Sequence, residues 1–169
     1  MRVLETERLV LRRLHAGDAP FIVELLNDPA WLEHIGDKGV RTRDDALGYL
    51  EKGPLEMYAR LGFGLYLAEG KGDGEPVGLC GLLKRDSLEH VDLGFALLPR
   101  FRGMGLAFEA AVGTMKYARM EFGLSRLVAI TSQTNLPSGR LLEKLGFRFE
   151  RNVRLATDGE ELRLYGVEL

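Results

Sequence analysis

The segment LLPRFRGMGLAFEAA, residues 97–111, carries two glycines and two arginines at the predicted start of a long helix. The helix is indicated by apolar residues that recur every three or four positions: Phe108, Ala111, Val112, Met115, Ala118 and Phe122. A glycine within a helix costs about 1 kcal/mol relative to alanine. Gly103 and Gly105 therefore require an explanation other than helix formation.

A phosphate-binding turn would explain these two glycines. The first backbone N–H groups of a helix have no partner within it, and with the positive end of the helix dipole they form a natural anion site. Glycine has no Cβ, so the backbone can approach a ligand closely. Arg100 and Arg102 flank the glycines and can donate charge-assisted hydrogen bonds. The alternative is a flexible loop with incidental glycines, because short glycine motifs are weak signals.

Two well-known phosphate motifs do not fit this segment. A Walker A loop has four residues between its glycines and then Gly-Lys-Ser/Thr, which is absent here. The dinucleotide fingerprint has a third glycine three residues further on, where this chain has Phe108. The pattern that fits is Arg/Gln-x-x-Gly-x-Gly/Ala, present as Arg100-Phe-Arg-Gly103-Met-Gly105.

This pattern resembles the acyl-coenzyme A pyrophosphate loop of the GNAT N-acetyltransferases. Its surroundings, LGFALLPRFRGMGLAFEAA and NLPSGRLLEKLGFRFE, are similar to the RimJ/RimL branch, the ribosomal-protein N-acetyltransferases. The opening LETERLVLRRL and the segment EPVGLCGL also resemble that branch, so the likeness covers nearly the whole chain. It implies acetyl-CoA as co-substrate and transfer of its acetyl group to a primary amine in a ternary complex.

The elements that must hold this loop alternate between strands and helices. Asp18 is the expected N-cap of a first helix, and Thr42 with Asp45 forms the capping box of a second, which Gly53-Pro54 interrupts. Strands are predicted at 6–14, 63–69, 77–85, 91–98, 126–132, 147–154 and 161–169, with a third helix after Gly105 and a fourth over 135–145. This order predicts an α+β fold, a mixed and mostly antiparallel sheet flanked by helices, in one domain over residues 1–169.

The resemblance implies which residues bind acetyl-CoA. Backbone amides of the turn bind the pyrophosphate, while strand 91–98 binds the pantetheine arm and diverges from strand 126–132 to leave a V-shaped slot. Strand alternation places Asp92 and Gly94 on the face opposite Leu93. The expected cofactor-binding residues are Leu93, Phe95, Leu97, Leu98, Arg100, Phe101, Arg102, Gly103, Met104, Gly105, Leu106, Asn135 and Ser138.

Amine acetylation needs a neutral nucleophile, a polarised thioester carbonyl and a proton for the leaving thiolate. Asp92 matches the strand position at which family members often carry an acid that serves as base. Its alternative is an ordinary solvated carboxylate, since aspartate has a reference pKa near 3.9 and is a weak base unless burial raises that pKa. His90, two residues earlier and expected on the same face, could supplement or replace Asp92, or lie at the surface. A metal bound by this pair is not expected, because candidate ligands are too few.

Asn135 and Ser138 match the Asn-x-x-Ser element of the family. Asn135 is expected to contact pantetheine, to cap its helix, or both. Many GNAT enzymes carry a tyrosine just before the Glu-Lys-x-Gly-Phe run as general acid, but here this residue is Leu142. Ser138 is then the better candidate to hydrogen-bond the sulfur, with a purely helical role as the alternative.

Composition excludes several other classes of protein. The net charge of −2 over 169 residues provides no basic field for nucleic acid or an anionic membrane. Cys80 is the only cysteine, so neither an internal disulfide nor a cysteine-based zinc site is expected, and a reducing compartment is indicated. The N-terminal residues do not resemble a signal peptide, and no apolar run approaches the ~18 residues of a membrane span. The expected location is the cytoplasm.

The acceptor amine is the least determined part of the reaction. The branch resemblance implies a protein N-terminus, and a small metabolite or antibiotic amine is the other possibility. Specificity is expected in residues 28–60, where Trp31 either packs in the core or lines the acceptor slot. A non-catalytic module that only binds or senses acyl-CoA is the alternative function, because Leu142 replaces the tyrosine and Asp92 is a short acid. The chain is expected to be a monomer or a homodimer.

Overall fold

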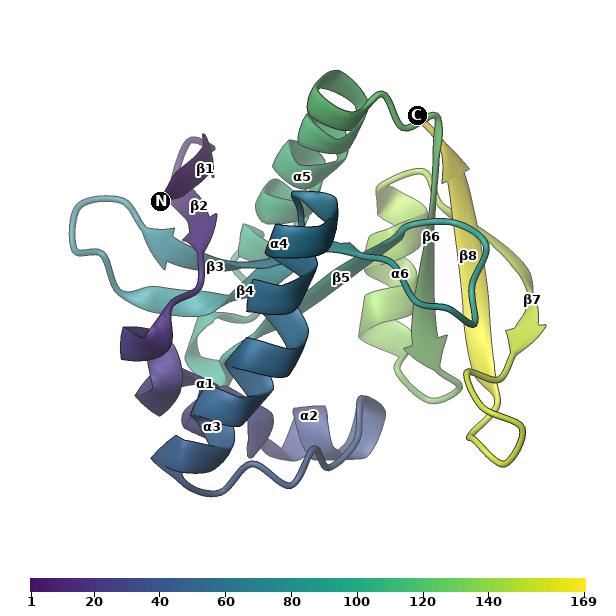
Figure 1. Cartoon of the computed structure of the whole chain (residues 1–169). Helices are drawn as coiled ribbons and strands as arrows, with labels where there is room; N and C mark the ends of the chain where they lie inside the picture. Colours follow the sequence, from purple (N-terminus) through teal and green to yellow (C-terminus); the bar gives the residue numbers. More distant parts are fainter.

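A computed structural model describes residues 1–169 and contains one eight-stranded mixed sheet (Figure 1). The strand order is β1-β2-β3-β4-β5-β6-β8-β7, and every neighbouring pair is antiparallel except β5 with β6. The strands are β1 Arg2–Glu5, β2 Leu9–Arg13, β3 Leu65–Gly70, β4 Pro76–Leu83, β5 Asp92–Leu97, β6 Arg126–Ser132, β7 Arg148–Val153 and β8 Leu162–Glu168. The predicted fold class, a mostly antiparallel mixed sheet flanked by helices, is confirmed.

Helices cover both faces of this sheet. They are α1 Ala19–Leu26, α2 Pro29–His34, α3 Arg43–Leu50, α4 Glu56–Leu61, α5 Leu106–Phe122 and α6 Leu136–Lys144, with shorter turns η1 Ala16–Asp18, η2 Glu51–Leu55 and η3 Pro99–Phe101. Tyr66 and Cys80 pack in the core beneath α5 and α6, whereas Leu67 and Leu79 pack beneath α1 to α3. This alternation along β3 and β4 is the period of two that a sheet buried on both faces requires. No helix combines the length and hydropathy needed to cross a membrane.

The first 34 residues differ from the prediction in two ways. They contain two strands where the sequence predicts one, and a helix, α2, where it predicts none. Residues 2–5 form β1, which pairs with β2. The turn between the two strands is closed by the Thr6 N–H, which donates to the Leu9 carbonyl at 2.9 Å. Helix α2 was not predicted because it is only six residues long. It begins at Pro29 and is capped by Asp28, whose carboxylate accepts from the Trp31 N–H at 3.4 Å.

Asp18 occupies the N-cap position of α1, as predicted, but its side chain forms no capping hydrogen bond there. His15 caps the first turn instead, because its Nδ1 accepts from the Gly17 N–H at 3.0 Å. The Asp18 carboxylate accepts from the Arg12 guanidinium at 2.8 and 3.0 Å and from the His15 N–H at 2.9 Å. The carboxylate thus serves the turn before α1 and the Arg12 guanidinium on β2, and sequence spacing does not reveal the second pairing.

The second predicted helix is not interrupted at Gly53-Pro54. Helix α3 continues through the π-helical turn η2 into α4, and the three form one rod in Figure 1. A π turn is wider than an α turn and is consistent with Pro54, which has no N–H to donate. Gly62, with φ of 81°, ends the rod. The capping box of Thr42 and Asp45 is confirmed.

Gly78 and Gly48 provide a matched test of packing between β4 and β5. A Cβ on Gly78 would lie 2.3 Å from the Ala96 carbonyl oxygen, whereas a Cβ on Gly48 in α3 would meet nothing within 4 Å. We expect Gly78→Ala to lower the free energy of unfolding by about 1–3 kcal/mol. Gly48→Ala should raise it by about 0.5–1 kcal/mol. Urea unfolding of both variants measures the difference, and equal effects would contradict the packing described for β4 and β5.

Candidate active site

Strands β5 and β6 touch at one end and separate towards the other. Their only paired residues are Asp92 and Val128, and the Val128 N–H donates to the Val91 carbonyl at 3.0 Å. Figure 1 shows the sheet dividing there into a part formed by β1–β5 and a part formed by β6, β8 and β7. The V-shaped slot expected between residues 91–98 and 126–132 is therefore present.

The slot leaves backbone groups of β5 unpaired. In a strand, the N–H and C=O of one residue point to the same neighbour, and alternate residues share that direction. Since Val91 bonds β6, Leu93 and Phe95 also direct their backbone groups towards β6. Leu93 still borders the Asp92–Val128 pair, whereas Phe95 lies beyond it, where β6 offers no paired residue. Leu98, also expected to bind the cofactor, does not direct its N–H into the slot: this group donates to the Val77 carbonyl on the other side at 3.0 Å, and the side chain is buried among the helices.

The glycine segment has the conformation that the sequence pattern suggested. Gly103 and Gly105 have φ of 76° and 78°, a region that side-chain-bearing residues enter at a cost of about 1–2 kcal/mol. Gly105 is the N-cap of α5 and provides no side-chain cap. Consequently the backbone N–H groups from Gly103 to Phe108 form no hydrogen bond within the protein. These donors at the positive end of a 17-residue helix are suited to a phosphate.

The two arginines beside this turn are already engaged. Arg100 pairs with Glu24 at 3.0 Å, and Arg102 pairs with Asp28 and donates to the Leu97 carbonyl at 2.8 Å. The unpaired anion-binding groups are thus the backbone amides rather than these guanidinium groups. Arg8, just before β2, also supports the turn and was not predicted. It donates to the Met104 carbonyl at 2.9 Å and to the Glu109 carboxylate at 2.7 Å. No motif indicates this contact, because Arg8 lies about a hundred residues before the turn in the sequence.

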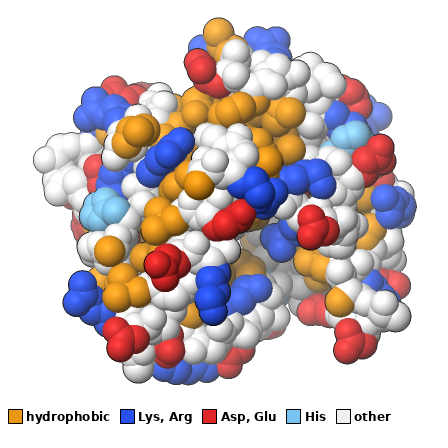
Figure 2. Space-filling view, viewed as in Figure 1, with side chains coloured by type: hydrophobic (Ala, Val, Ile, Leu, Met, Phe, Trp, Pro, Cys, Tyr) orange, Lys and Arg blue, Asp and Glu red, His pale blue; other side chains and the backbone are white.

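A cavity of about 540 Å³ opens where β5 and β6 separate. In Figure 2 the surface is hollowed between the part that carries α3 and α4 and the part that carries β7 and β8. Strands β5 and β6 and helix α6 form one wall, and segments between residues 31 and 57 form the opposite wall. The region expected to determine acceptor specificity therefore faces the slot. Trp31 is both buried, at 6% exposure, and part of this lining.

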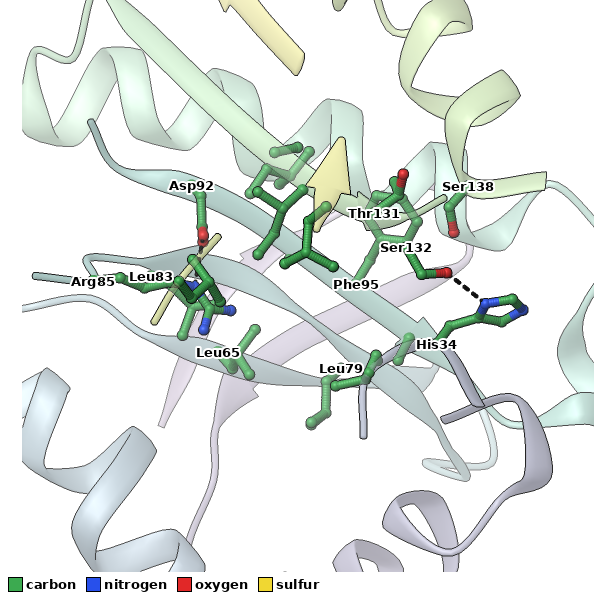
Figure 3. A pocket seen from close by; sticks show the side chains of 18 of the residues that line it. His34, Leu65, Leu79, Leu83, Arg85, Asp92, Phe95, Thr131, Ser132 and Ser138 are labelled. Atoms are coloured by element: carbon green, nitrogen blue, oxygen red, sulfur yellow. Dashed lines mark hydrogen bonds and ion pairs between the residues drawn. The ribbon is translucent and has the colours of Figure 1, made fainter. Parts of the chain in front are cut away.

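Asp92 lies at the point where the two strands meet. Its side chain is buried, lines the cavity and accepts from Arg85 Nε through Oδ2 at 2.9 Å (Figure 3). The other oxygen, Oδ1, is buried and has no hydrogen-bond partner. Burial raises the pKa of the Asp92 carboxyl, and the Arg85 charge only partly opposes this. Asp92 is thus not an ordinary solvated carboxylate.

His90 does not share a face with Asp92, contrary to the expectation. Strand β5 begins at Asp92, and His90 lies in the bend before it, so the alternation of a strand does not apply. Its imidazole lies 3.8 Å from Glu89 and lines a separate, smaller cavity with Arg126 and Glu150. The structure therefore brings Asp92, but not His90, to the main cavity.

The start of α6 contributes the polar groups on the other side of the slot. Asn135 caps this helix, since its Oδ1 accepts from the Ser138 N–H at 3.3 Å, and both residues line the cavity. Leu142, one turn further on, is buried in the same lining. Figure 3 shows Ser138 and Asp92 on opposite sides of Phe95.

A histidine–serine contact joins the two walls and was not predicted. Nδ1 of His34, at the end of α2, lies 2.7 Å from Oγ of Ser132, at the end of β6 (Figure 3). His34 falls within the region assigned to acceptor specificity, but no motif in the sequence singles it out. The contact holds α2 against the open end of the slot.

Comparison with known proteins gives the same assignment over most of the chain. The sequence model of the acetyltransferase (GNAT) domain matches residues 8–148. The [ribosomal protein uS5]-alanine N-acetyltransferase of Escherichia coli is 28% identical, over 93% of this chain and 84% of its own. An acetyltransferase from Agrobacterium tumefaciens superposes with a TM-score of 0.83 at 26% identity, covering 98% of this chain and 94% of its own.

A third match concerns the fold alone. RimL, described as a ribosomal L7/L12 alpha-N-protein acetyltransferase in complex with coenzyme A, superposes with a TM-score of 0.84 at 17% identity, over 100% of this chain and 98% of its own. None of these matches supports the alternative of a non-catalytic acyl-CoA module. The matched residues 8–148 include the slot, the glycine turn and Asp92, and the chain belongs to the GNAT family as an N-acetyltransferase.

Proposed function

We propose that this N-acetyltransferase carries acetyl-CoA in the slot between β5 and β6 and passes the acetyl group directly to a primary amine that enters from the α2–α4 side. The observation that carries the proposal is the single pairing of Asp92 with Val128. Beyond it, unpaired backbone groups extend from the buried carboxylate towards the glycine turn. One cavity borders both the slot and the wall formed by residues 31–57.

The chain has groups that fit each part of acetyl-CoA. The N–H groups from Gly103 to Phe108 suit the diphosphate, because they are unpaired donors at a helix N-terminus. The backbone of Phe95 and the carbonyl of Leu93, which face β6 without a paired residue there, suit the amide groups of the pantetheine arm. Asn135 lies across the slot from them and lines the same cavity. When bound, acetyl-CoA supplies an activated thioester and a thiol leaving group.

Asp92 is proposed as the base that takes the proton from the amine. Arg85 holds Oδ2, so Oδ1 is the oxygen left to accept the proton. A base acts best when its pKa is near the working pH, and burial moves the pKa of Asp92 in that direction. The raised pKa removes the main objection to an aspartate in this role, its low reference value.

Ser138 is proposed to hydrogen-bond the departing sulfur. It lines the cavity at the start of α6, and its hydroxyl makes no hydrogen bond within the protein. Leu142 cannot donate a proton, so the chain has no tyrosine acid there. A thiol with a pKa of about 8.5 leaves readily as thiolate, and a weak hydrogen-bond donor is sufficient.

The acceptor is a protein N-terminus or a small amine. The relative from Escherichia coli is named for the alanine of a ribosomal protein, which supports an N-terminal amine. A cavity of about 540 Å³ has room for the first residues of a peptide or for a whole small molecule. Residues 31–57 line its acceptor side and are the proposed specificity determinants.

The proposal predicts turnover with an amine present. Acetyl-CoA should release free thiol faster when peptides with free N-termini or small primary amines are added, and mass spectrometry should find the amine 42 Da heavier, as one acetyl group requires. Release that no amine in either group accelerates, despite binding of acetyl-CoA, would contradict it.

Replacing the proposed base should separate activity from stability. Asp92→Asn should lower kcat roughly 10²–10⁴-fold. Because the folded pKa of Asp92 is raised, ionisation destabilises the fold as pH rises from about 4. The stability of Asp92→Asn relative to wild type should therefore increase between about pH 4 and pH 7 in urea unfolding.

The matched control is Asp86→Asn, an exposed carboxylate in the loop before β5. It should leave both kcat and the pH dependence of stability unchanged. An Asp92→Asn enzyme with kcat within twofold of wild type would exclude Asp92 as the base.

A further inference from the structure

Three hydrogen-bond donors line the acceptor side of the cavity without a protein acceptor. Arg85 uses Nε for Asp92, and neither of its terminal nitrogens forms a hydrogen bond. Lys38, in the loop after α2, forms no ion pair, and the Tyr49 hydroxyl, on α3, forms no hydrogen bond, although both line the cavity. Three segments far apart in sequence thus present donors to one space.

Lys38 and Tyr49 each lie close enough to Arg85 to feel its charge. The pKa of Lys38 is lowered first by burial and then by the charge of Arg85. Burial raises the pKa of Tyr49 to about 12, and Arg85 opposes that rise. The Tyr49 hydroxyl therefore stays protonated at neutral pH and remains a donor. Arg85 is the common neighbour of both, and of Asp92.

The surroundings of these donors are apolar, and acidic partners are few. Leu65, Leu83 and Met57 line the same part of the cavity, and Figure 3 shows Leu83 and Leu65 beside Arg85. The only acidic side chains in the lining are Asp92, which Arg85 already holds, and Glu160, which pairs with neither cation. Lys38 is exposed, and Arg85 and Tyr49 are half-buried, so a ligand can reach all three donors. With no protein acceptor competing for them, they favour an oxygen-rich anion, to which Arg and Lys form charge-assisted hydrogen bonds.

We propose that the acceptor amine carries a carboxylate, which the free nitrogens of Arg85, the Lys38 ammonium and the Tyr49 hydroxyl bind together. The proposal rests on the proposed function and specifies its substrate class. Charge-assisted hydrogen bonds from Arg and Lys to a carboxylate are among the strongest in proteins. The same cations disfavour the protonated form of an amine bound nearby, and so favour its neutral, nucleophilic form. They also discriminate against acceptors with several positive charges.

Binding of matched acid and amide probes tests this directly. Calorimetry on the enzyme saturated with coenzyme A, which has no acetyl group to transfer, compares β-alanine with β-alaninamide and Ala-Glu-amide with Ala-Gln-amide. The acid of at least one pair should bind about tenfold more tightly, as expected for hydrogen bonds to a charged group. The first pair represents small amines and the second represents peptide N-termini, so the result also shows which source supplies the carboxylate.

Variants of Lys38 identify the group responsible. Lys38→Gln should reduce the preference for the acid about tenfold, whereas Lys38→Arg, which keeps the charge, should preserve it. Lys116→Gln, an exposed lysine on α5 away from the cavity, is the matched control and should leave the preference unchanged.

Two results would overturn the carboxylate proposal. One is equal or absent binding of acid and amide in both pairs, and the other is an undiminished preference in Lys38→Gln. Acetyl transfer to Ala-Gln-amide without any preference for the acid would overturn this inference while leaving the proposed function intact. Acid-selective binding with no transfer to any amine would overturn the proposed function while leaving the carboxylate site intact.

Discussion

The parting of β5 from β6 is the constraint on which the rest of the site depends. A single pairing, Asp92 with Val128, joins the two strands, and beyond it their backbones find no partners in each other. Buried backbone groups are normally paired, so a persistent gap in the middle of a sheet calls for a ligand that supplies hydrogen bonds. The arm of acetyl-CoA, with its own amide groups, is such a ligand, and the family to which the chain belongs is consistent with it.

The same junction holds the proposed catalytic base. Asp92 is buried because β5 meets both β4 and β6 at this residue, and Arg85 is the only side chain that forms a hydrogen bond with its carboxylate. Burial raises the pKa of the carboxyl, which suits a base. Arg85 bonds Asp92 through Nε alone, so its two terminal nitrogens remain free for another ligand. One ion pair therefore links the proposed base to the wall on which Lys38 and Tyr49 present their donors. In the proposed mechanism, Arg85 serves both the base and the selection of the acceptor.

Local patterns predicted local features well. The glycines of the turn, the faces of β5 and the capping box of Thr42 depend on neighbours within a few residues, and all are present. The features that differ from expectation depend on contacts between elements: the Asp18 side chain bonds Arg12 on β2 instead of capping α1, and the Leu98 N–H bonds β4. The expected face of His90 differs because this residue precedes its strand. The pairing of Asp92 with Arg85 crosses a turn that no motif marks. Which charges meet is decided by tertiary structure, and a single sequence does not contain a readable signal for it.

Calorimetric binding of acetyl-CoA to glycine variants tests the central claim most directly. Gly103→Ala and Gly105→Ala should weaken binding at least about tenfold, because a Cβ intrudes where backbone amides must approach a phosphate. Gly123→Ala imposes similar strain at the other end of α5, with φ of 63° and open space around it, and should bind normally. Acetyl-pantetheine, which lacks the diphosphate, should bind the wild type and the three variants equally. Unchanged affinity of both turn variants for acetyl-CoA would contradict the account.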